Sequence, residues 1–129
     1  IMEIGARLGG DFISTELTPI STGIDMVAAA IDCSLGIEPN LKPIKEKQSV
    51  CIRYFCPNPG KLVSINNTDI LSNDNIYDYK FYHTKRGTII PEIKSSLDRF
   101  GHVIVTDSTP QLAIQFADQI INEICILTE

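Results

Sequence analysis

Hydrophobic residues recur at three- and four-residue intervals in two segments of the chain, and this spacing predicts two amphipathic helices. In the first segment, Asp25 would lie in the first turn, where a carboxylate suits the helix dipole. Ser21 or Thr22 could cap the start, and Gly36 suits a left-handed C-terminal cap. The apolar stripe of this helix consists of Ile24, Val27, Ala28, Ile31 and Leu35.

The second predicted helix follows the sequence DSTP near the C-terminus. Pro110 fits its first turn because the missing N–H would be unpaired there in any case. Ser108 or Thr109 could cap its start. The expected inner face consists of Ala113, Phe116, Ala117, Ile120, Ile121 and Ile124.

Between the two helices the pattern changes to that of β-strands. The run VCIRYFC, the turn-forming PNPG and the run KLVSI predict a β-hairpin. In IYDYKFY, the aromatic residues Tyr77, Tyr79 and Phe81 alternate with Asp78 and Lys80, so we expect one packed aromatic face. The continuous apolar run GHVIVT predicts a strand that is buried on both faces.

Together these elements predict an α+β fold with a mostly antiparallel sheet and two main helices. A short strand, a long loop and the first helix fall in residues 1–37. A polar connector with two prolines occupies residues 38–49, and the remaining strands and the second helix occupy residues 50–129. The length of 129 residues fits one modest hydrophobic core.

Composition narrows the classes of function. Hydrophobic residues make up 43% and charged residues 21%, which is typical of a soluble globular chain. Sixteen acidic and 11 basic residues give a net charge of -5, so counterion release on nucleic acid would not favour binding. No apolar run approaches the ~20 residues that span a bilayer, and no secretory signal is recognisable. We therefore expect a cytoplasmic protein that binds neither nucleic acid nor membranes.

The cysteines and histidines have mainly structural interpretations. No two cysteines form a C-x-x-C pair, so buried reduced thiols are favoured over a zinc site. We expect His83 to be an exposed loop residue. His102 opens an apolar strand and should be satisfied structurally, with a catalytic role as the alternative. The four cysteines are Cys33, Cys51, Cys56 and Cys125.

A carboxylate and an arginine lie close together in the first residues, IMEIGARLGGD. Glu3 could bind a hard cation such as Mg²⁺, which prefers oxygen ligands. Arg7 could hold a carboxylate or phosphate in a planar fork, and amides near Gly9 and Gly10 could face an anion. The alternative is an edge strand whose Glu3 and Arg7 side chains face water.

The segments EIGARLGGDFIS and STGIDMVAAAIDCSLG resemble the end of the ATP-grasp domain in carboxylate–amine ligases. These include amino-acid ligases and phosphoribosylglycinamide-synthetase-like or carbamoyl-phosphate-synthase-like enzymes. The similarity continues through IRYFCPNPGKL, KRGTIIP and SSLDRFGHVIVTDSTPQLAIQFA, which resemble the C-terminal lid subdomain. The resemblance implies that residues 1–37 end the ATP-grasp core and that residues 50–129 form the lid.

The resemblance also implies roles for individual residues. Glu3 matches the glutamate that binds Mg²⁺ between the ATP phosphates, and Arg7 matches an arginine that contacts the acyl phosphate or the substrate carboxylate. Gly9 and Gly10 match a glycine pair whose amides border that site. Gly5 departs from the pattern, because many relatives carry a metal-binding asparagine there. The candidates for a loop that faces the acceptor substrate are Asp11, Ser21 and Thr22.

The implied cofactors are ATP and Mg²⁺, with Mn²⁺ as an alternative metal. The implied partners are a small carboxylate and an amine, which the complete enzyme would join through an acyl phosphate. The chain resembles only the C-terminal part of such a ligase, so we expect it to be inactive alone. Arg99 matches a lid arginine that could form an ion pair or contact phosphate. The alternative is a non-catalytic module or a subunit of a split ligase, for which a homodimer is one option.

Overall fold

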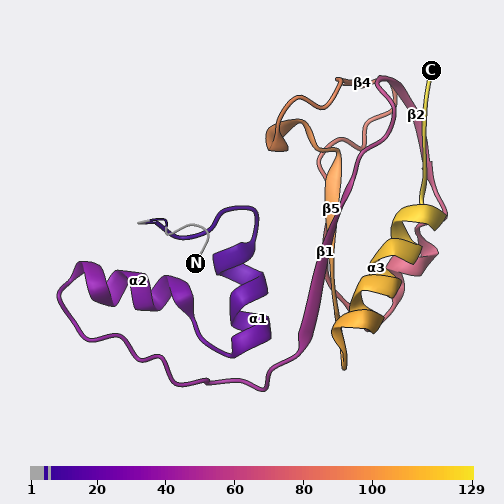
Figure 1. Ribbon diagram of the computed structural model, residues 1–129. Helices are drawn as coiled ribbons and strands as arrows, with labels where there is room; N and C mark the ends of the chain where they lie inside the picture. The colour runs from indigo at the N-terminus through magenta and orange to yellow at the C-terminus, as the bar shows by residue number, and fades with distance from the viewer. Residues whose placement is uncertain (1–4, 6) are drawn as a thin grey trace. The chain divides into compact units, whose positions relative to one another are not determined.

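The computed structural model describes residue 5 and residues 7–129, and the chain divides into two compact units, Ile1–Val50 and Cys51–Glu129 (Figure 1). The first unit contains a π-helical turn at Ile13–Leu17 and the helices α1 (Thr18–Thr22) and α2 (Met26–Ser34). The remaining elements are β1 (Ser49–Phe55), β2 (Gly60–Asn66), β3 (Ile76–Phe81), β4 (Ile89–Ile90), β5 (Gly101–Asp107), α3 (Pro110–Glu123) and β6 (Cys125–Thr128), with short 3₁₀ turns at Thr68–Ser72 and Ser96–Asp98.

The first predicted helix is confirmed as α2, but its cap differs from the prediction. The Asp25 carboxylate accepts the backbone N–H groups of Val27 and Ala28 at 3.1 and 2.9 Å, so Asp25 is the N-terminal cap. Ser21 and Thr22 lie in the preceding helix α1 and do not cap α2. An additional short helix therefore occupies part of the predicted long loop.

The C-terminal end of α2 is formed as predicted. Gly36 has a φ of 71°, and the backbone N–H of Ile37 donates to the carbonyl oxygen of Asp32 at 2.9 Å. This is the left-handed cap that glycine adopts at low cost. The apolar stripe is less buried than the pattern predicts, because Ile31 and Leu35 are 55% and 68% exposed.

The second unit contains two three-stranded sheets, with the strand orders β1–β5–β3 and β4–β2–β6. Strand β3 is antiparallel to β5, and β2 is antiparallel to both β4 and β6. The predicted α+β class with mostly antiparallel strands and two main helices is therefore confirmed. The prediction of a single sheet is wrong.

The predicted hairpin between β1 and β2 is also wrong, although both strands are present. The two strands lie in different sheets, and β1 is hydrogen-bonded to β5. The backbone N–H of Phe100 donates to the carbonyl oxygen of Phe55 at 3.0 Å at the end of β1. Pro57 and Pro59, in the connection between β1 and β2, lack the N–H groups that a continuous hairpin ladder requires. The connection therefore leads the chain from one sheet to the other.

The hydrophobic core of the second unit lies between β5 and α3 (Figure 1). Val103, Ile104 and Val105 are fully buried, which confirms that β5 is covered on both faces. Helix α3 begins where predicted, because the Thr109 hydroxyl oxygen accepts the backbone N–H of Leu112 at 3.3 Å. The predicted inner face of α3 is confirmed by the buried residues Ala113, Ala117, Ile120 and Ile124 and by the partly buried Phe116 and Ile121.

The predicted aromatic face of β3 is reduced to one residue. Phe81 packs against Phe55 and Phe100, with ring centroids 4.9 and 5.9 Å apart. Tyr77 and Tyr79 are instead 52% and 45% exposed. Strand β3 lies at the edge of its sheet, and its register against β5 shifts between Ile76 and Asp78. Strict alternation along the strand therefore does not bury all three aromatic side chains.

The prediction of buried thiols holds for one cysteine. All four cysteines are free thiols, and Cys51 is buried. Cys33, Cys56 and Cys125 are exposed, so the prediction is wrong for them. Cys125 lies on β6, a strand that the sequence did not predict, and it alternates there with the partly buried Ile126.

Candidate functional site

The predicted metal ligand Glu3 lies outside the described residues, so the candidate site is built from the segment that follows it. Gly5 is exposed, and no heavy atom lies within 4 Å of the position that a Cβ atom would occupy. The space around Gly5 would therefore accept the asparagine that many resembling ligases carry. No described residue packs closely enough on Gly5 to force this departure.

Arg7 is exposed, and its Nη1 atom donates to the neighbouring carbonyl oxygen of Leu8 at 3.1 Å. A guanidinium carries five N–H donors in a planar fork, so this local bond uses only a small part of its capacity. The side chain can therefore hold a carboxylate or phosphate in the manner predicted from the sequence.

The surroundings of the two glycines after Arg7 differ, and only one of the two positions requires glycine. A Cβ atom on Gly9 would lie 2.8 Å from Cγ2 of Ile13, so a side chain at that position would clash. Gly10 has no heavy atom within 4 Å of the corresponding position. The carbonyl oxygen of Gly9 accepts the hydroxyl of the buried Ser14 at 3.0 Å, and that of Gly10 accepts the backbone N–H of Ile13 at 2.9 Å. Packing therefore requires Gly9, whereas the open side of Gly10 leaves its backbone accessible.

The turn continues through two consecutive non-glycine residues in the left-handed region. Asp11 has a φ of 51° and Phe12 a φ of 67°. Such conformations are uncommon outside glycine and often occur at functional sites. The carbonyl oxygen of Phe12 accepts the N–H groups of Glu16 and Leu17 at 3.0 and 2.9 Å, which begins the π-helical turn. The exposed Asp11 therefore has a defined backbone position beside the glycine pair. No sequence signal indicated the π-helical turn.

The other two candidates for the substrate loop lie in helix α1 and not in a loop. The Ser21 hydroxyl donates to the carbonyl oxygen of Leu17, and the Thr22 hydroxyl donates to that of Thr18, both at 2.7 Å. These hydroxyl protons are used within the helix, so substrate contact would have to use the oxygen lone pairs. A role for either residue in substrate binding stays a prediction, as does the role of Asp11.

Within residue 5 and residues 7–129, no three His, Cys, Asp or Glu side chains gather to form a metal site. Mg²⁺ at nucleotide sites is commonly bound by one or two carboxylates together with substrate phosphates. Glu3 lies outside the described residues, so its part in such a site stays a prediction.

A second polar cluster joins β5, β3 and the residue after β3. Nε2 of His102 lies 3.0 Å from Oδ2 of Asp78, and its Nδ1 lies 2.8 Å from the hydroxyl of Tyr82. In a neutral imidazole with this geometry, Nε2 donates its hydrogen to the carboxylate and Nδ1 accepts the Tyr82 hydroxyl. The His102 side chain is only 2% exposed, which confirms that it is satisfied structurally. His83 is half-buried, with its ring 6.2 Å from that of Phe100, so it is less exposed than predicted.

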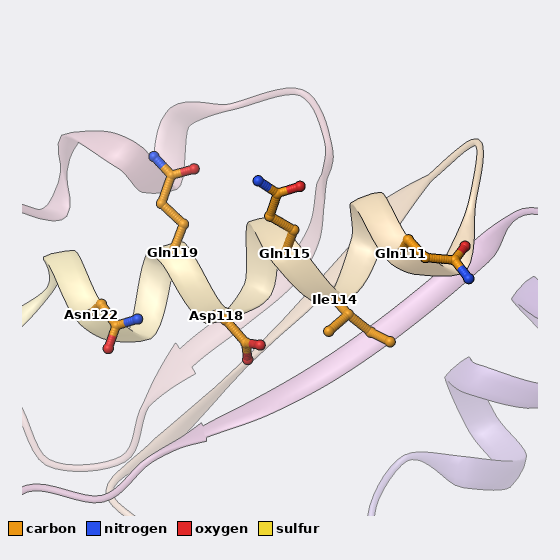
Figure 2. A pocket seen from close by; sticks show the side chains of 6 residues that line it. All are labelled: Gln111, Ile114, Gln115, Asp118, Gln119 and Asn122. Carbon is orange, nitrogen blue, oxygen red and sulfur yellow. The ribbon is translucent and has the colours of Figure 1, made fainter.

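A third cluster links β1 to α3. Nε of Arg53 donates to Oδ1 of Asp118 at 2.6 Å, and Nη1 of Arg53 donates to the Cys51 sulfur at 3.0 Å. Burial raises the pKa of the Cys51 thiol, while the charge of Arg53 acts in the opposite direction. Asp118 of this cluster also lines a hollow of about 680 Å³ on α3 (Figure 2). It is lined by Gln111, Ile114, Gln115, Asp118, Gln119 and Asn122.

Arg99 makes a contact that neither of its predicted roles included. Its guanidinium carbon lies 3.8 Å from the centroid of the Tyr54 ring, which is a cation–π contact. Arg99 also differs from Arg7 in that its side chain is half-buried against the second unit's own aromatic surface.

In the part of the chain that is described, no helix combines the length and the apolar character required to cross a bilayer.

Two solved structures share this fold. The phosphoribosylglycinamide synthetase from Anaerococcus prevotii matches with a TM-score of 0.73 and 24% identity, over 95% of this chain and 32% of that protein. The L-amino acid ligase from Bacillus licheniformis matches with a TM-score of 0.72 and 17% identity, over 97% of this chain and 31% of that protein. The fold is therefore that of the C-terminal part of an ATP-grasp ligase. The chain spans about a third of the length of these two ligases.

A sequence family refines this class. The family model for L-amino acid ligase C-terminal domain 2 matches residues 53–129, which is more than half of the chain. The chain belongs to the L-amino acid ligase C-terminal domain 2 family. No curated protein matches the sequence.

Proposed function

We propose that this chain is the C-terminal part of an ATP-dependent ligase that activates a carboxylate as an acyl phosphate and joins it to an amine. The observation that carries the proposal is the match of 95% and 97% of the chain to two solved ligases, together with the family match over residues 53–129. Because the chain spans about a third of those proteins, we propose that the rest of the ATP site lies in another part of the ligase. The chain alone would then be inactive.

In the proposed reaction, a carboxylate oxygen of the substrate attacks the γ-phosphorus of ATP, and ADP leaves. The amine nitrogen then attacks the acyl carbon, phosphate leaves, and the amine loses a proton. Catalysis of such steps consists mainly of positioning and of neutralising charge. Mg²⁺ bound by Glu3 and by ATP would neutralise phosphate charge.

The described residues would supply the anion-binding part of this site. The exposed Arg7 fork would hold the carboxylate or the acyl phosphate in a fixed orientation. The open side of Gly10 would allow its backbone to approach an oxyanion. Asp11 would face the amine from the adjoining strained turn.

The test is ADP formation by the native polypeptide that carries this sequence, assayed with ATP, Mg²⁺ and a panel of amino acids as carboxylate and amine. Glu3→Gln should abolish ADP formation, and Arg7→Met should reduce kcat by about 10²–10³, as the loss of an oxyanion donor does in other enzymes. Arg86→Met, at an exposed arginine of the second unit, is the matched control and should retain activity. Normal activity of the Arg7→Met and Glu3→Gln variants would remove both residues from the mechanism.

The second candidate is a non-catalytic assembly module or a subunit of a split ligase. Its support is the exposure of several large apolar side chains in the first unit. The intact mass of the native polypeptide separates the two candidates. A product of 14.3 kDa would favour the module, for which sedimentation at high concentration tests the proposed homodimer.

A further inference from the structure

A second hollow of the second unit, about 270 Å³ in volume, is lined by α3, the end of β5 and the turn before β3. This volume is far larger than the ~30 Å³ that one water molecule occupies, and it approaches the lower end of ligand pockets at about 300 Å³. None of the residues assigned to the proposed reaction lines it. We call it the Asp107 pocket, and its polar lining consists of Asn73, Asn75, Asp107, Gln115 and Gln119.

The turn that forms one wall of the Asp107 pocket is tied to β5. The backbone N–H of Thr106 donates to the carbonyl oxygen of Asn75 at 2.8 Å, and the Asn75 side-chain nitrogen donates to Oδ2 of Asp107 at 3.0 Å. Within the turn, the side-chain oxygen of Asn73 accepts the backbone N–H of Asn75 at 2.9 Å. Asp107 is half-buried, and its Oδ1 accepts the backbone N–H of Ser108 at 2.6 Å. The carboxylate is therefore held in one position and orientation.

Helix α3 adds two side-chain amides, one helical turn apart. Figure 2 shows the Gln115 and Gln119 side chains pointing to the same side of the helix. Nε2 of Gln119 donates to Oε1 of Glu123 at 2.7 Å, which leaves the Gln119 amide oxygen as an acceptor. Among the described residues, the Gln115 amide has no hydrogen-bond partner. Two amide oxygens are thus available to a ligand.

The same helix gives the Asp107 pocket an apolar part. Leu112 and Phe116 are also one turn apart and complete the lining. Phe116 packs against the hydrophobic core, so its ring is held in place. A ligand for this pocket would therefore combine a polar group with a short aliphatic segment.

The charge of the lining distinguishes between classes of polar ligand. The lining contains the Asp107 carboxylate and no Lys, Arg or His side chain, and Asp74 adds a second carboxylate in the adjoining turn. The α3 N-terminus contributes about half a positive charge, which the Asp107 carboxylate outweighs. An ammonium group has three N–H donors and no acceptor. The oxygens of Asp107, Gln115 and Gln119 provide three acceptors for it, whereas an anion would be repelled.

We propose that the Asp107 pocket binds a small aliphatic amine, with the ammonium group on Asp107 and the aliphatic segment on Leu112 and Phe116. The Asp107 carboxylate supplies the charge-assisted hydrogen bond, which is stronger than a bond between neutral groups. The two glutamine oxygens accept the remaining N–H groups. This binding site goes beyond the proposed function, because none of its residues takes part in that reaction.

Nuclear magnetic resonance of the isotope-labelled 129-residue chain tests the proposal, with butylamine as the probe. The side-chain amide resonances of Asn73, Asn75, Gln115 and Gln119 should shift and saturate with a Kd of the order of 1 mM. Those of Asn58, which does not line the pocket, should stay unchanged. Shifts spread over the whole surface, or no saturation below about 20 mM, would overturn the proposal.

Two ligands with the same carbon chain isolate the contribution of the ammonium group. Butyrate and 1-butanol should each bind at least about tenfold more weakly than butylamine at the same ionic strength. Equal affinity for 1-butanol would mean that the pocket recognises only the aliphatic chain, and equal affinity for butyrate would contradict the charge argument. Either result would overturn the proposal.

Substitutions separate a built site from the general attraction of an acidic chain for amines. Asp107→Asn keeps a side-chain oxygen for the Ser108 N–H and should weaken butylamine binding at least about tenfold. The control is Glu92→Gln, which removes an exposed carboxylate outside the lining and should change the Kd by less than about twofold. Equal weakening in the two variants would overturn the proposal.

A second variant covers the case in which Asp107→Asn disturbs the fold. Gln115→Leu replaces an exposed side chain without a described hydrogen-bond partner, so the fold should be retained. Binding of butylamine should weaken by about threefold or more, since one acceptor is lost. Gln111→Leu, at an exposed glutamine outside this pocket, should leave the Kd unchanged. An unchanged Kd in a folded Gln115→Leu variant would overturn the proposal.

Discussion

The two units of this chain use similar apolar patterns with different results. In the second unit, the stripe of α3 is buried, and Ile120 is fully inaccessible to solvent. In the first unit, the corresponding spacing on α2 leaves Ile31 and Leu35 more than half exposed. The difference shows that hydrophobic periodicity indicates which face of a helix is suited to packing. It does not report whether the cover belongs to the same chain.

The largest predicted effect is the difference in stability between isoleucine-to-alanine substitutions in the two units. Ile120→Ala should destabilise the 129-residue chain by about 2–5 kcal/mol, because it opens a cavity in the core. Ile31→Ala should change the free energy of unfolding by less than ~0.5 kcal/mol, as is usual for exposed positions. Urea unfolding followed by circular dichroism measures both. Similar losses in the two variants would mean that the first unit has a core of its own.

A smaller effect is expected at the buried histidine of the second unit. Tyr82→Phe removes the hydroxyl that lies 2.8 Å from Nδ1 of the buried His102 as its hydrogen-bond partner. This should cost about 1–3 kcal/mol. The control is Tyr79→Phe at an exposed ring on the preceding strand β3, which should be neutral. Equal midpoints for the two variants would show that water replaces the lost hydroxyl.

The next effect should be confined to α2. Asp25→Ala removes the N-terminal cap and should weaken this helix by about 1 kcal/mol. We expect faster amide exchange in α2 and an unchanged unfolding midpoint for the second unit. Thr109→Ala at the cap of α3 is the counterpart, and it should lower that midpoint because α3 is part of the core. A global change in the Asp25→Ala variant would contradict the independence of the two units.

The smallest effect concerns thiol chemistry. Three exposed cysteines should react with a thiol reagent at pH 8 within the mixing phase, and Cys51 should react only on unfolding. Burial raises the pKa of the Cys51 thiol, so the folded state favours its protonated form. The contribution of this pKa shift to the free energy of unfolding is fully present below the pKa that Cys51 has in the unfolded chain. It is lost as the pH rises through the pKa that Cys51 has in the folded chain. Rapid reaction of all four thiols in the folded chain would contradict the burial of Cys51.

Much of the fold could be predicted from short sequence features, such as helix caps and apolar strand runs. Gly36 and Thr109 act through backbone geometry and capping, which depend on a few neighbouring residues. Gly36 was correctly placed, and Thr109 was one of the two predicted caps. The strand in GHVIVT was recognisable because burial on both faces favours a continuous apolar run, and in the structure it extends to Asp107. The pairing of β1 with β5, by contrast, depends on residues that are far apart in the sequence. Neither the prolines of PNPG nor the strand runs alone indicated that partner.

The candidate site was less predictable than the fold. The spacing of Arg7 and Gly9 suggested an anion site, and the structure gives Gly9 a packing reason as well. The left-handed conformations of Asp11 and Phe12 carry no sequence signal, because neither residue is the glycine that such a turn would normally use. The hydrogen-bond partners of His102 could not be predicted without knowing the register of β3 against β5. The alternation of apolar and polar residues does not determine that register.

The position of β6 has a consequence for the synthesis of the protein. Strand β2 pairs with β6 from Asn66 opposite Cys125 to Leu62 opposite Thr128. The ribosome therefore releases β2 well before the strand that completes its sheet has been made, since synthesis proceeds at about 5–20 residues per second. During this interval one edge of β2 has unpaired N–H and C=O groups, which are a template for wrong strand pairing. The nascent chain is thus most open to aggregation in the seconds before β6 emerges.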